Sequence, residues 1–185
     1  MWAKLSRDAT SSPSLFDMTV DTVSWDLSPL VYGEGDAGAD RLLDEAAARA
    51  QTFAATYAGR AAELDPPAFA AAVHELMDLS ELAGRAGNYA MLRFSVDTAD
   101  PEIGALMQRV QEKSTAIETQ LLFFELEWAT LEDDKAEELL CADGLDTARH
   151  FLRSTRRYRP HLLSEPEMDF SLRIFSSASL SRYGR

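Results

Sequence analysis

Apolar side chains recur every three or four residues through three long stretches of this chain, which is the spacing of one face of an α-helix. The first stretch, 40–64, has them at Leu42, Ala46, Ala50, Phe53, Tyr57, Ala61 and Leu64. The second has them at Phe69, Val73, Leu76, Leu79, Ala83, Ala86, Ala90 and Phe94. The third has them at Ile103, Leu106, Val110, Ile117, Leu121, Phe124, Trp128 and Leu131, and the polar Ser114 takes one further position of the same stripe. Three such stripes predict an all-α fold.

Proline-containing breaks separate these stretches. Asp65-Pro66-Pro67 ends the first stretch, and residues 97–101 end the second. Asp100 suits the N-cap of a third helix and Pro101 its first position, so this helix is predicted to run to about Thr130. Because the breaks are short, consecutive helices should be antiparallel neighbours, which predicts long helical hairpins.

The end of the third stretch is apolar on more than one side. Leu122, Phe123 and Leu126 widen the stripe there, so we expect another layer of helix against it. Two shorter C-terminal helices are predicted at 133–141 and 145–157, with a turn at Asp143-Gly144 between them. In the last helix four side chains are expected to face inward: Leu145, Ala148, Phe151 and Leu152.

The chain before the first stripe has no helical period. Residues 1–24 carry scattered Ser, Thr and Asp, and we expect a flexible leader there. In residues 25–32, Trp25 and Tyr32 flank three aliphatic side chains, which indicates an extended N-terminal segment pinned onto the helical body. Three glycines are then expected to loosen the chain before the first helix: Gly33, Gly35 and Gly38.

The second stretch contains a strip of small residues. Gly84 and Gly87 each cost about 1 kcal/mol relative to Ala within a helix. Together with Ala83, Ala86 and Ala90 they form a smooth surface. Such a surface predicts the close approach of another backbone.

Composition excludes several classes of protein. The formal net charge of -13 repels phosphate backbones, so nucleic-acid binding is not expected. The densest apolar run, 121–124, is too short to span a bilayer, and no apolar signal-peptide core follows Lys4 and Arg7. The single cysteine, Cys141, excludes an internal disulfide. We therefore expect one cytoplasmic domain with no membrane contact, large enough at 185 residues to need no metal or disulfide for stability.

One segment approaches a zinc motif. His74-Glu75-Leu76-Met77-Asp78 differs by one residue from HExxH, in which two histidines on one helical face bind the metal. Asp78 replaces the second histidine, no third ligand is evident, and none of the three histidines belongs to the Glu-x-x-His pair of a di-iron bundle. We interpret these residues as structural and predict no metal-binding residue.

Two further groups of charged side chains are candidate sites. Glu125 and Glu127 flank Leu126 in the widest apolar region, but they point to different helical faces, which favours an ion-pair or surface role. The other group is a cluster of five arginines: Arg149, Arg153, Arg156, Arg157 and Arg159. Such a cluster can bind a carboxylate or a phosphate, yet arginines near a helix C-terminus more typically complement the helix dipole. Cys141 has no nearby histidine, and no Gly-rich phosphate loop or Gly-x-Ser-x-Gly elbow occurs. The sequence predicts no catalytic or cofactor-binding residue.

The pattern changes near the C-terminus. Ser164 to Glu167 form a capping box, but the residues that follow alternate with period two instead of continuing a helix. Residues 168–185 hold one acidic side chain and three basic ones, whereas the rest of the chain is strongly acidic. We interpret 168–185 as an atypical tail, from a frameshift or a cloning scar; the alternative is an ordinary polar tail.

Several segments resemble, in order, the N-terminal region of the oligoendopeptidase F family, relatives of thimet oligopeptidase among the zinc metallopeptidases. The segments are Trp25 to Leu30, Phe53 to Arg60, Tyr89-Ala90 before 97–101, Leu122 to Trp128, His150 to Arg153, and Arg159 to Glu167. The resemblance covers about residues 20–167 and defines 25–167 as a helical N-terminal domain. It stops at Met168.

This resemblance implies part of a hydrolase that cleaves short peptides. In the family an N-terminal helical part walls a deep channel, while HExxH and a downstream Glu bind zinc far along the chain. None of those ligands is present here, so zinc is implied only for a full-length parent. The first hypothesis is an inactive N-terminal fragment whose partners are a missing C-terminal catalytic domain and, in the parent, a peptide. One alternative is a freestanding acidic helical interaction module, which would bind a protein partner or a second copy through the Gly84 and Gly87 strip or through the exposed side of Leu121 to Trp128. The other is an enzyme that uses His74 and Asp78 itself.

Overall fold

The computed structural model describes residues 25–157 and 159, and the regular secondary structure within them is entirely helical. The elements are η1 (Ser28–Val31), α1 (Gly35–Tyr57), η2 (Ala61–Glu63), α2 (Pro66–Val96), α3 (Pro101–Thr130), α4 (Asp133–Leu140) and α5 (Arg149–Arg157). No strand occurs in this part of the chain, which confirms the all-α prediction. The predicted leader 1–24, the capping box at Ser164 and the tail 168–185 lie outside the described residues.

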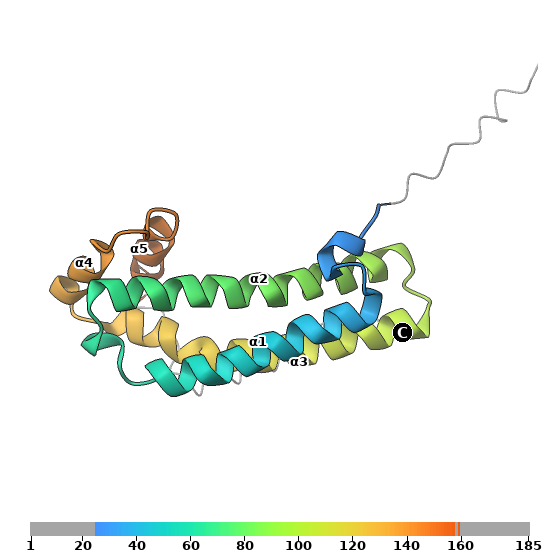
Figure 1. The fold of residues 1–185 in the computed structure, drawn as a ribbon, viewed down its shortest axis with the longest axis horizontal. Helices are drawn as coiled ribbons and strands as arrows, with labels where there is room; N and C mark the ends of the chain where they lie inside the picture. Colours follow the sequence, from blue (N-terminus) through green and yellow to red (C-terminus); the bar gives the residue numbers. More distant parts are fainter. Residues whose placement is uncertain (1–24, 158, 160–185) are drawn as a thin grey trace, which may run out of the picture.

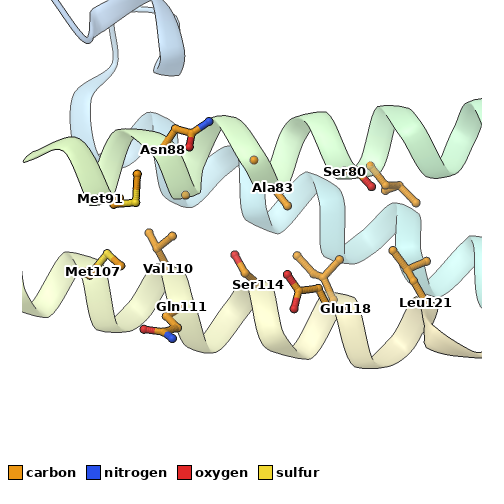
Figure 2. A pocket seen from close by; sticks show the side chains of 14 residues that line it. Ser80, Ala83, Asn88, Met91, Met107, Val110, Gln111, Ser114, Glu118 and Leu121 are labelled. Atoms are coloured by element: carbon orange, nitrogen blue, oxygen red, sulfur yellow. The ribbon is translucent and has the colours of Figure 1, made fainter. Parts of the chain in front are cut away.

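Three long helices, α1, α2 and α3, lie side by side along the molecule (Figure 1). Neighbours in sequence run antiparallel, as the short breaks predict, and α4 and α5 sit at the end where α2 begins. Seen from the side of α2 and α3, α1 lies behind them (Figure 2). The three helices therefore pack as a bundle in which α1 covers one side of the α2–α3 pair.

The bounds of α2 and α3 follow from their caps. The Asp65 carboxylate accepts the backbone N–H of Ala68 at 2.8 Å, and the Asp100 carboxylate accepts that of Glu102 at 2.8 Å. Both caps satisfy N–H groups that have no partner within the first turn. The predictions for these two helices are confirmed.

The prediction for α1 needs correction at both ends. Gly35 and Gly38 do not loosen the chain ahead of the helix; α1 begins at Gly35 and contains Gly38. The stripe is not continuous to Leu64 either, because α1 ends at Tyr57 and Gly59 takes a positive φ of 74°. Ala61 and Leu64 remain buried, since the turn and η2 carry them back onto the core.

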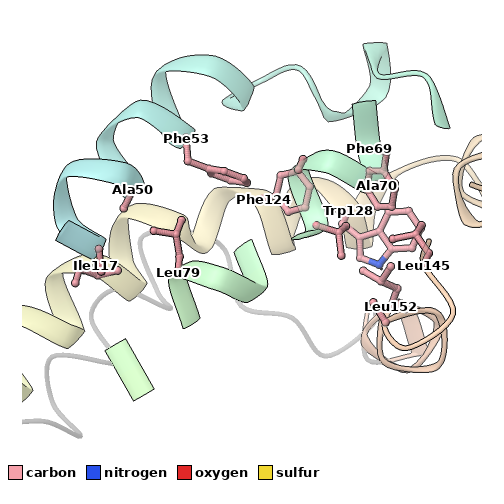
Figure 3. Packing of buried hydrophobic residues seen from close by; sticks show 14 of the residues in the cluster. Ala50, Phe53, Phe69, Ala70, Leu79, Ile117, Phe124, Trp128, Leu145 and Leu152 are labelled. Carbon is pink, nitrogen blue, oxygen red and sulfur yellow. Dashed lines mark hydrogen bonds between the residues drawn. The ribbon is translucent and has the colours of Figure 1, made fainter. Parts of the chain in front are cut away.

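Aromatic rings from all three long helices form one end of the core (Figure 3). Phe124 of α3 lies 5.3 Å from Phe53 of α1 and 5.9 Å from Phe69 of α2, measured between ring centroids. The Trp128 indole lies 4.9 Å from Phe69 and donates its Nε1–H to the carbonyl of Leu152 at 3.0 Å. This bond ties α5 to α3 and confirms the additional helical layer expected at the broad end of α3.

Residues 25–32 are pinned to the bundle mainly by Val31 and by backbone carbonyls. Val31 is fully buried, and Arg85 of α2 donates to the carbonyls of Pro29 and Leu30 at 2.6 and 3.0 Å. Tyr32 is 56% exposed but also contacts Arg85, which donates to its hydroxyl at 2.9 Å, whereas Trp25 is 79% exposed. The last four residues before Tyr32 form η1.

The C-terminal helices match their predicted places, with two differences. α5 begins at Arg149, and Leu145 and Ala148 are buried in the turn before it. Phe151 is 66% exposed instead of facing inward. None of the described helices combines the length and the apolar character needed to cross a membrane.

Candidate functional site

The side of the α2–α3 pair that α1 leaves uncovered is hollowed by a groove. One section, about 430 Å³ in volume, runs between the two helices (Figure 2). Ala83, Gly84 and Gly87 line it from α2, and Val110 and Ser114 line it from α3. Small side chains on facing helices leave this space open.

The glycine strip lies in this groove. A Cβ atom added at Gly84 or Gly87 would meet no atom within 4 Å. No backbone in the described part of the chain therefore packs on these two glycines. The close approach that the sequence predicts stays a prediction.

A second and larger section of about 930 Å³ continues the groove toward α5. Its walls are the first half of α2, the last third of α3, and α5 with the residues just before it. Both sections share Ser80, Glu118 and Leu121, and we call the two together the α2/α3 groove. Large apolar side chains stand exposed along it: Met77 at 45%, Met91 at 48% and Phe151 at 66%.

Four carboxylates border the α2/α3 groove: Asp78, Glu81, Glu118 and Glu125. Asp78 lies 3.6 Å from Arg49 and Glu81 lies 3.9 Å from Arg85. Within the described ranges, neither Glu118 nor Glu125 has a cationic nitrogen within 4 Å. Glu118 is exposed, but partial desolvation at its position on α3 raises its pKa. The groove is thus apolar along its floor and acidic at its edges.

The zinc-like segment is engaged in structural contacts. His74 Nε2 lies 2.9 Å from the carbonyl oxygen of Gly144, and since a carbonyl only accepts, Nε2 carries the proton. Glu75 forms a two-bond pair with Arg49, both bonds at 2.9 Å, and this pairing lowers the pKa of Glu75. No group of three His, Cys, Asp or Glu side chains suitable for a metal exists in residues 25–157 or at 159. These residues therefore do not fit a zinc ion.

Glu125 and Glu127 separate as the sequence indicated, but one has an unexpected partner. Glu125 is exposed at the groove. Glu127 pairs with no cation among the residues that the structure describes; its two carboxylate oxygens accept the backbone N–H groups of Gly59 at 2.6 Å and Ala61 at 3.1 Å. Glu127 thereby holds the turn between α1 and α2.

The basic cluster closes the ends of neighbouring helices. Arg156 donates to the carbonyls of Trp128 and Leu131 at 2.7 Å each, and it also pairs with Asp133 at 2.6 Å. Arg149 likewise donates to the carbonyl of Leu140 at 3.0 Å. The guanidinium groups thus satisfy carbonyls at the C-termini of α3 and α4, where cations are favourable.

The α2/α3 groove contains both surfaces that the interaction-module alternative assigns to a partner, the Gly84 and Gly87 strip and the side of α3 from Leu121 to Trp128, although the sequence did not predict that the two form one groove. Its sequence signal was the Gly84 and Gly87 strip, which indicates a close contact but not whether the contact is made inside the chain. Exposure of Met77 and Phe151 depends on how α5 packs, and no local pattern shows that. The two sections of the groove together offer a large area to another molecule.

Comparison with known proteins gives one match. Residues 127–168 match the family model described as oligopeptidase F, which represents the N-terminal part of the M3 peptidases. The matched range begins at the end of α3, includes α4 and α5, and ends at Met168. No curated protein and no solved structure matches the chain. The match supports part of the resemblance found in the sequence and concerns a region that is not catalytic in those peptidases.

Proposed function

We propose that this chain is the N-terminal, non-catalytic helical portion of a zinc-dependent oligoendopeptidase that hydrolyses short peptides. The observation that carries the proposal is the match of residues 127–168 to the N-terminal oligopeptidase F model. The all-helical bundle is consistent with such a portion. A cytoplasmic location belongs to the same proposal.

In this proposal the α2/α3 groove forms part of the wall of the peptide channel. An apolar floor with acidic edges suits the side chains of a short peptide and its positively charged amino terminus. The groove sections are long and open, as a chain-shaped ligand requires. Binding along this wall would orient the peptide but would not cleave it.

Zinc chemistry would come from outside the described residues. His74, Glu75 and Asp78 are occupied by Gly144 and Arg49, so they supply no open ligand set. The metal ion and its water-activating carboxylate would belong to the catalytic domain, the proposed partner of this chain. In that complex, this chain would position the peptide and would not take part in the cleavage.

The first test is to translate, in all three frames, the nucleotide sequence that follows the codon for Glu167. An open frame that encodes HExxH supports the proposal and supplies the partner for a mixing experiment. That partner and the full chain are purified separately, and hydrolysis of a quenched fluorescent short peptide is measured for each and for the mixture. We expect at least a tenfold gain in the mixture.

A matched pair of variants tests the role of the groove. Ser114→Trp fills the groove, whereas Ala116→Trp adds the same bulk on an exposed part of α3 outside it. The first variant should lower kcat/KM of the mixture and the second should leave it unchanged. No gain on mixing, together with a clean monomer or symmetric dimer of the chain, would favour a freestanding interaction module instead.

A further inference from the structure

The walls of the α2/α3 groove carry carboxylates but no cation. Glu118 lines both sections, and Asp78, Glu81 and Glu125 line the larger one. None of the lining residues, all of which belong to the described part of the chain, is a lysine, an arginine or a histidine. A groove lined by charges of one sign attracts ligands of the other sign. The α2/α3 groove therefore favours a positively charged ligand.

The two glutamates of α3 are the open acceptors in this groove. Ion pairs among the described residues include Asp78 and Glu81 but neither Glu118 nor Glu125. Partial desolvation raises the pKa of Glu118, so a cation beside it would stabilise its charged form. Along the axis of α3 the two glutamates lie about 10 Å apart. One wall can thus bind two basic groups of the same ligand.

The remaining surface of the groove suits apolar side chains. Met77, Met91 and Phe151 are each at least 45% exposed and border the groove. Methionine side chains are flexible and adapt to apolar partners of different shape. At Gly84 and Gly87 even an added Cβ atom would meet nothing within 4 Å, so a bulky side chain of a ligand has room there. Contiguous exposed apolar surface of this kind marks a binding site.

The length of the groove matches a short peptide. It follows α3 from Met107 to Trp128, about 31 Å at 1.5 Å per residue. An extended peptide of about nine residues has this length. Asn88 and Gln111 line the smaller section (Figure 2), and their side-chain amides can both donate to a peptide backbone and accept from it.

We propose that the α2/α3 groove binds short peptides that carry lysine or arginine next to apolar side chains. The basic groups pair with Glu118 and Glu125, and the apolar side chains cover the floor. This inference names the substrate class of the proposed function and rests on it. Acidic peptides are disfavoured because the carboxylates of the groove repel them, and a second copy fits less well because each copy has a net charge of -13.

Fluorescence anisotropy with the full chain alone tests the peptide class. The probes are two dye-labelled short peptides of equal length, one of alternating leucine and lysine and one of alternating leucine and glutamate. We expect the dissociation constant of the lysine peptide to be at least tenfold lower. Binding of neither peptide would overturn the inference. Because the whole chain is acidic, this ranking also needs variants that locate the binding.

Two double variants of α3 locate the charge preference. Glu118→Gln with Glu125→Gln removes two charges inside the groove, whereas Glu102→Gln with Glu112→Gln removes two exposed charges outside it. The first should weaken binding of the lysine peptide at least fivefold and the second less than twofold. Circular dichroism checks that both remain folded. Equal weakening would overturn the inference, since the peptide would then respond only to the overall charge.

The substitutions Ser114→Trp and Ala116→Trp locate the bound peptide. The first fills the groove and should weaken binding at least fivefold, whereas the second lies outside the groove and should not. Unchanged binding to the Ser114→Trp variant would overturn the inference, because the peptide would then lie elsewhere.

This binding experiment separates the substrate class from the proposed function. If both peptides bind equally and Ser114→Trp blocks both, the groove binds peptides as the proposed function requires, but the basic class is wrong. If the lysine peptide binds as expected and mixing with an HExxH-bearing partner gives no gain in hydrolysis, the ligand class stands and the assignment to a peptidase fails.

Discussion

The Glu127 carboxylate accepts the backbone N–H of Gly59 at 2.6 Å, across 68 positions of sequence. Its second oxygen accepts the N–H of Ala61 at 3.1 Å. Gly59 has a φ of 74°, a conformation that glycine adopts easily, and the bond fixes it there. One side chain of α3 thus ends α1 and directs the chain into α2.

Replacing Glu127 with Ala should destabilise the protein by about 1–3 kcal/mol, since the exposed N–H of Gly59 and the partly buried N–H of Ala61 both lose a charged acceptor. Urea denaturation followed by circular dichroism measures the change. Glu125→Ala is the matched control, because Glu125 lies two residues away on the same helix and accepts no such bond. Equal effects of the two substitutions would show that Glu127 does not hold the turn.

The helical glycines should respond in opposite directions to alanine. A Cβ atom at Gly38 would clash with the Val31 carbonyl oxygen, so Gly38→Ala must displace η1 and should lower the melting temperature. Gly84→Ala meets nothing within 4 Å and should stabilise α2 by up to about 1 kcal/mol. Thermal unfolding of both variants checks the signs. A stabilised Gly38→Ala variant would contradict the close packing of η1 on α1.

Local sequence signals were enough for the parts of the fold that local bonds determine. Asp65 and Asp100 cap the helices that begin one residue later, and the long apolar stripes show which faces are buried. The bounds of α2 and the start of α3 could therefore be predicted from a few neighbouring residues.

Other features depend on contacts between distant residues. The end of α1 is determined by Gly59 together with Glu127, and the start of α1 by the approach of Val31 to Gly38. The α2/α3 groove exists because α1 covers only one side of the pair and α5 leaves Phe151 exposed. A stripe of apolar residues shows that a face will be covered, but not by which element.

The Arg49–Glu75 pair gives the fold a defined pH dependence. The hydrogen bonds that Arg49 donates to Glu75 lower the pKa of this carboxylate from its ordinary value of 4.5. The folded protein therefore binds a proton at Glu75 more weakly than the unfolded chain does. The stabilisation is fully present above pH 4.5 and is lost as the pH falls through the lower folded-state pKa. The difference in melting temperature between wild type and Glu75→Gln should therefore be largest near neutral pH and shrink below about pH 4.5.

Thermal unfolding from pH 7 to pH 2.5 measures this difference. Glu81→Gln is the control on the same helix, because Glu81 is 70% exposed and lies 3.9 Å from its cation, so its effect should be small at every pH. Acid unfolding of the rest of the protein affects wild type and variant alike and cancels in the comparison. If the difference for Glu75→Gln stays constant down to pH 2.5, the pair does not contribute through the charge of Glu75, and its role is packing alone.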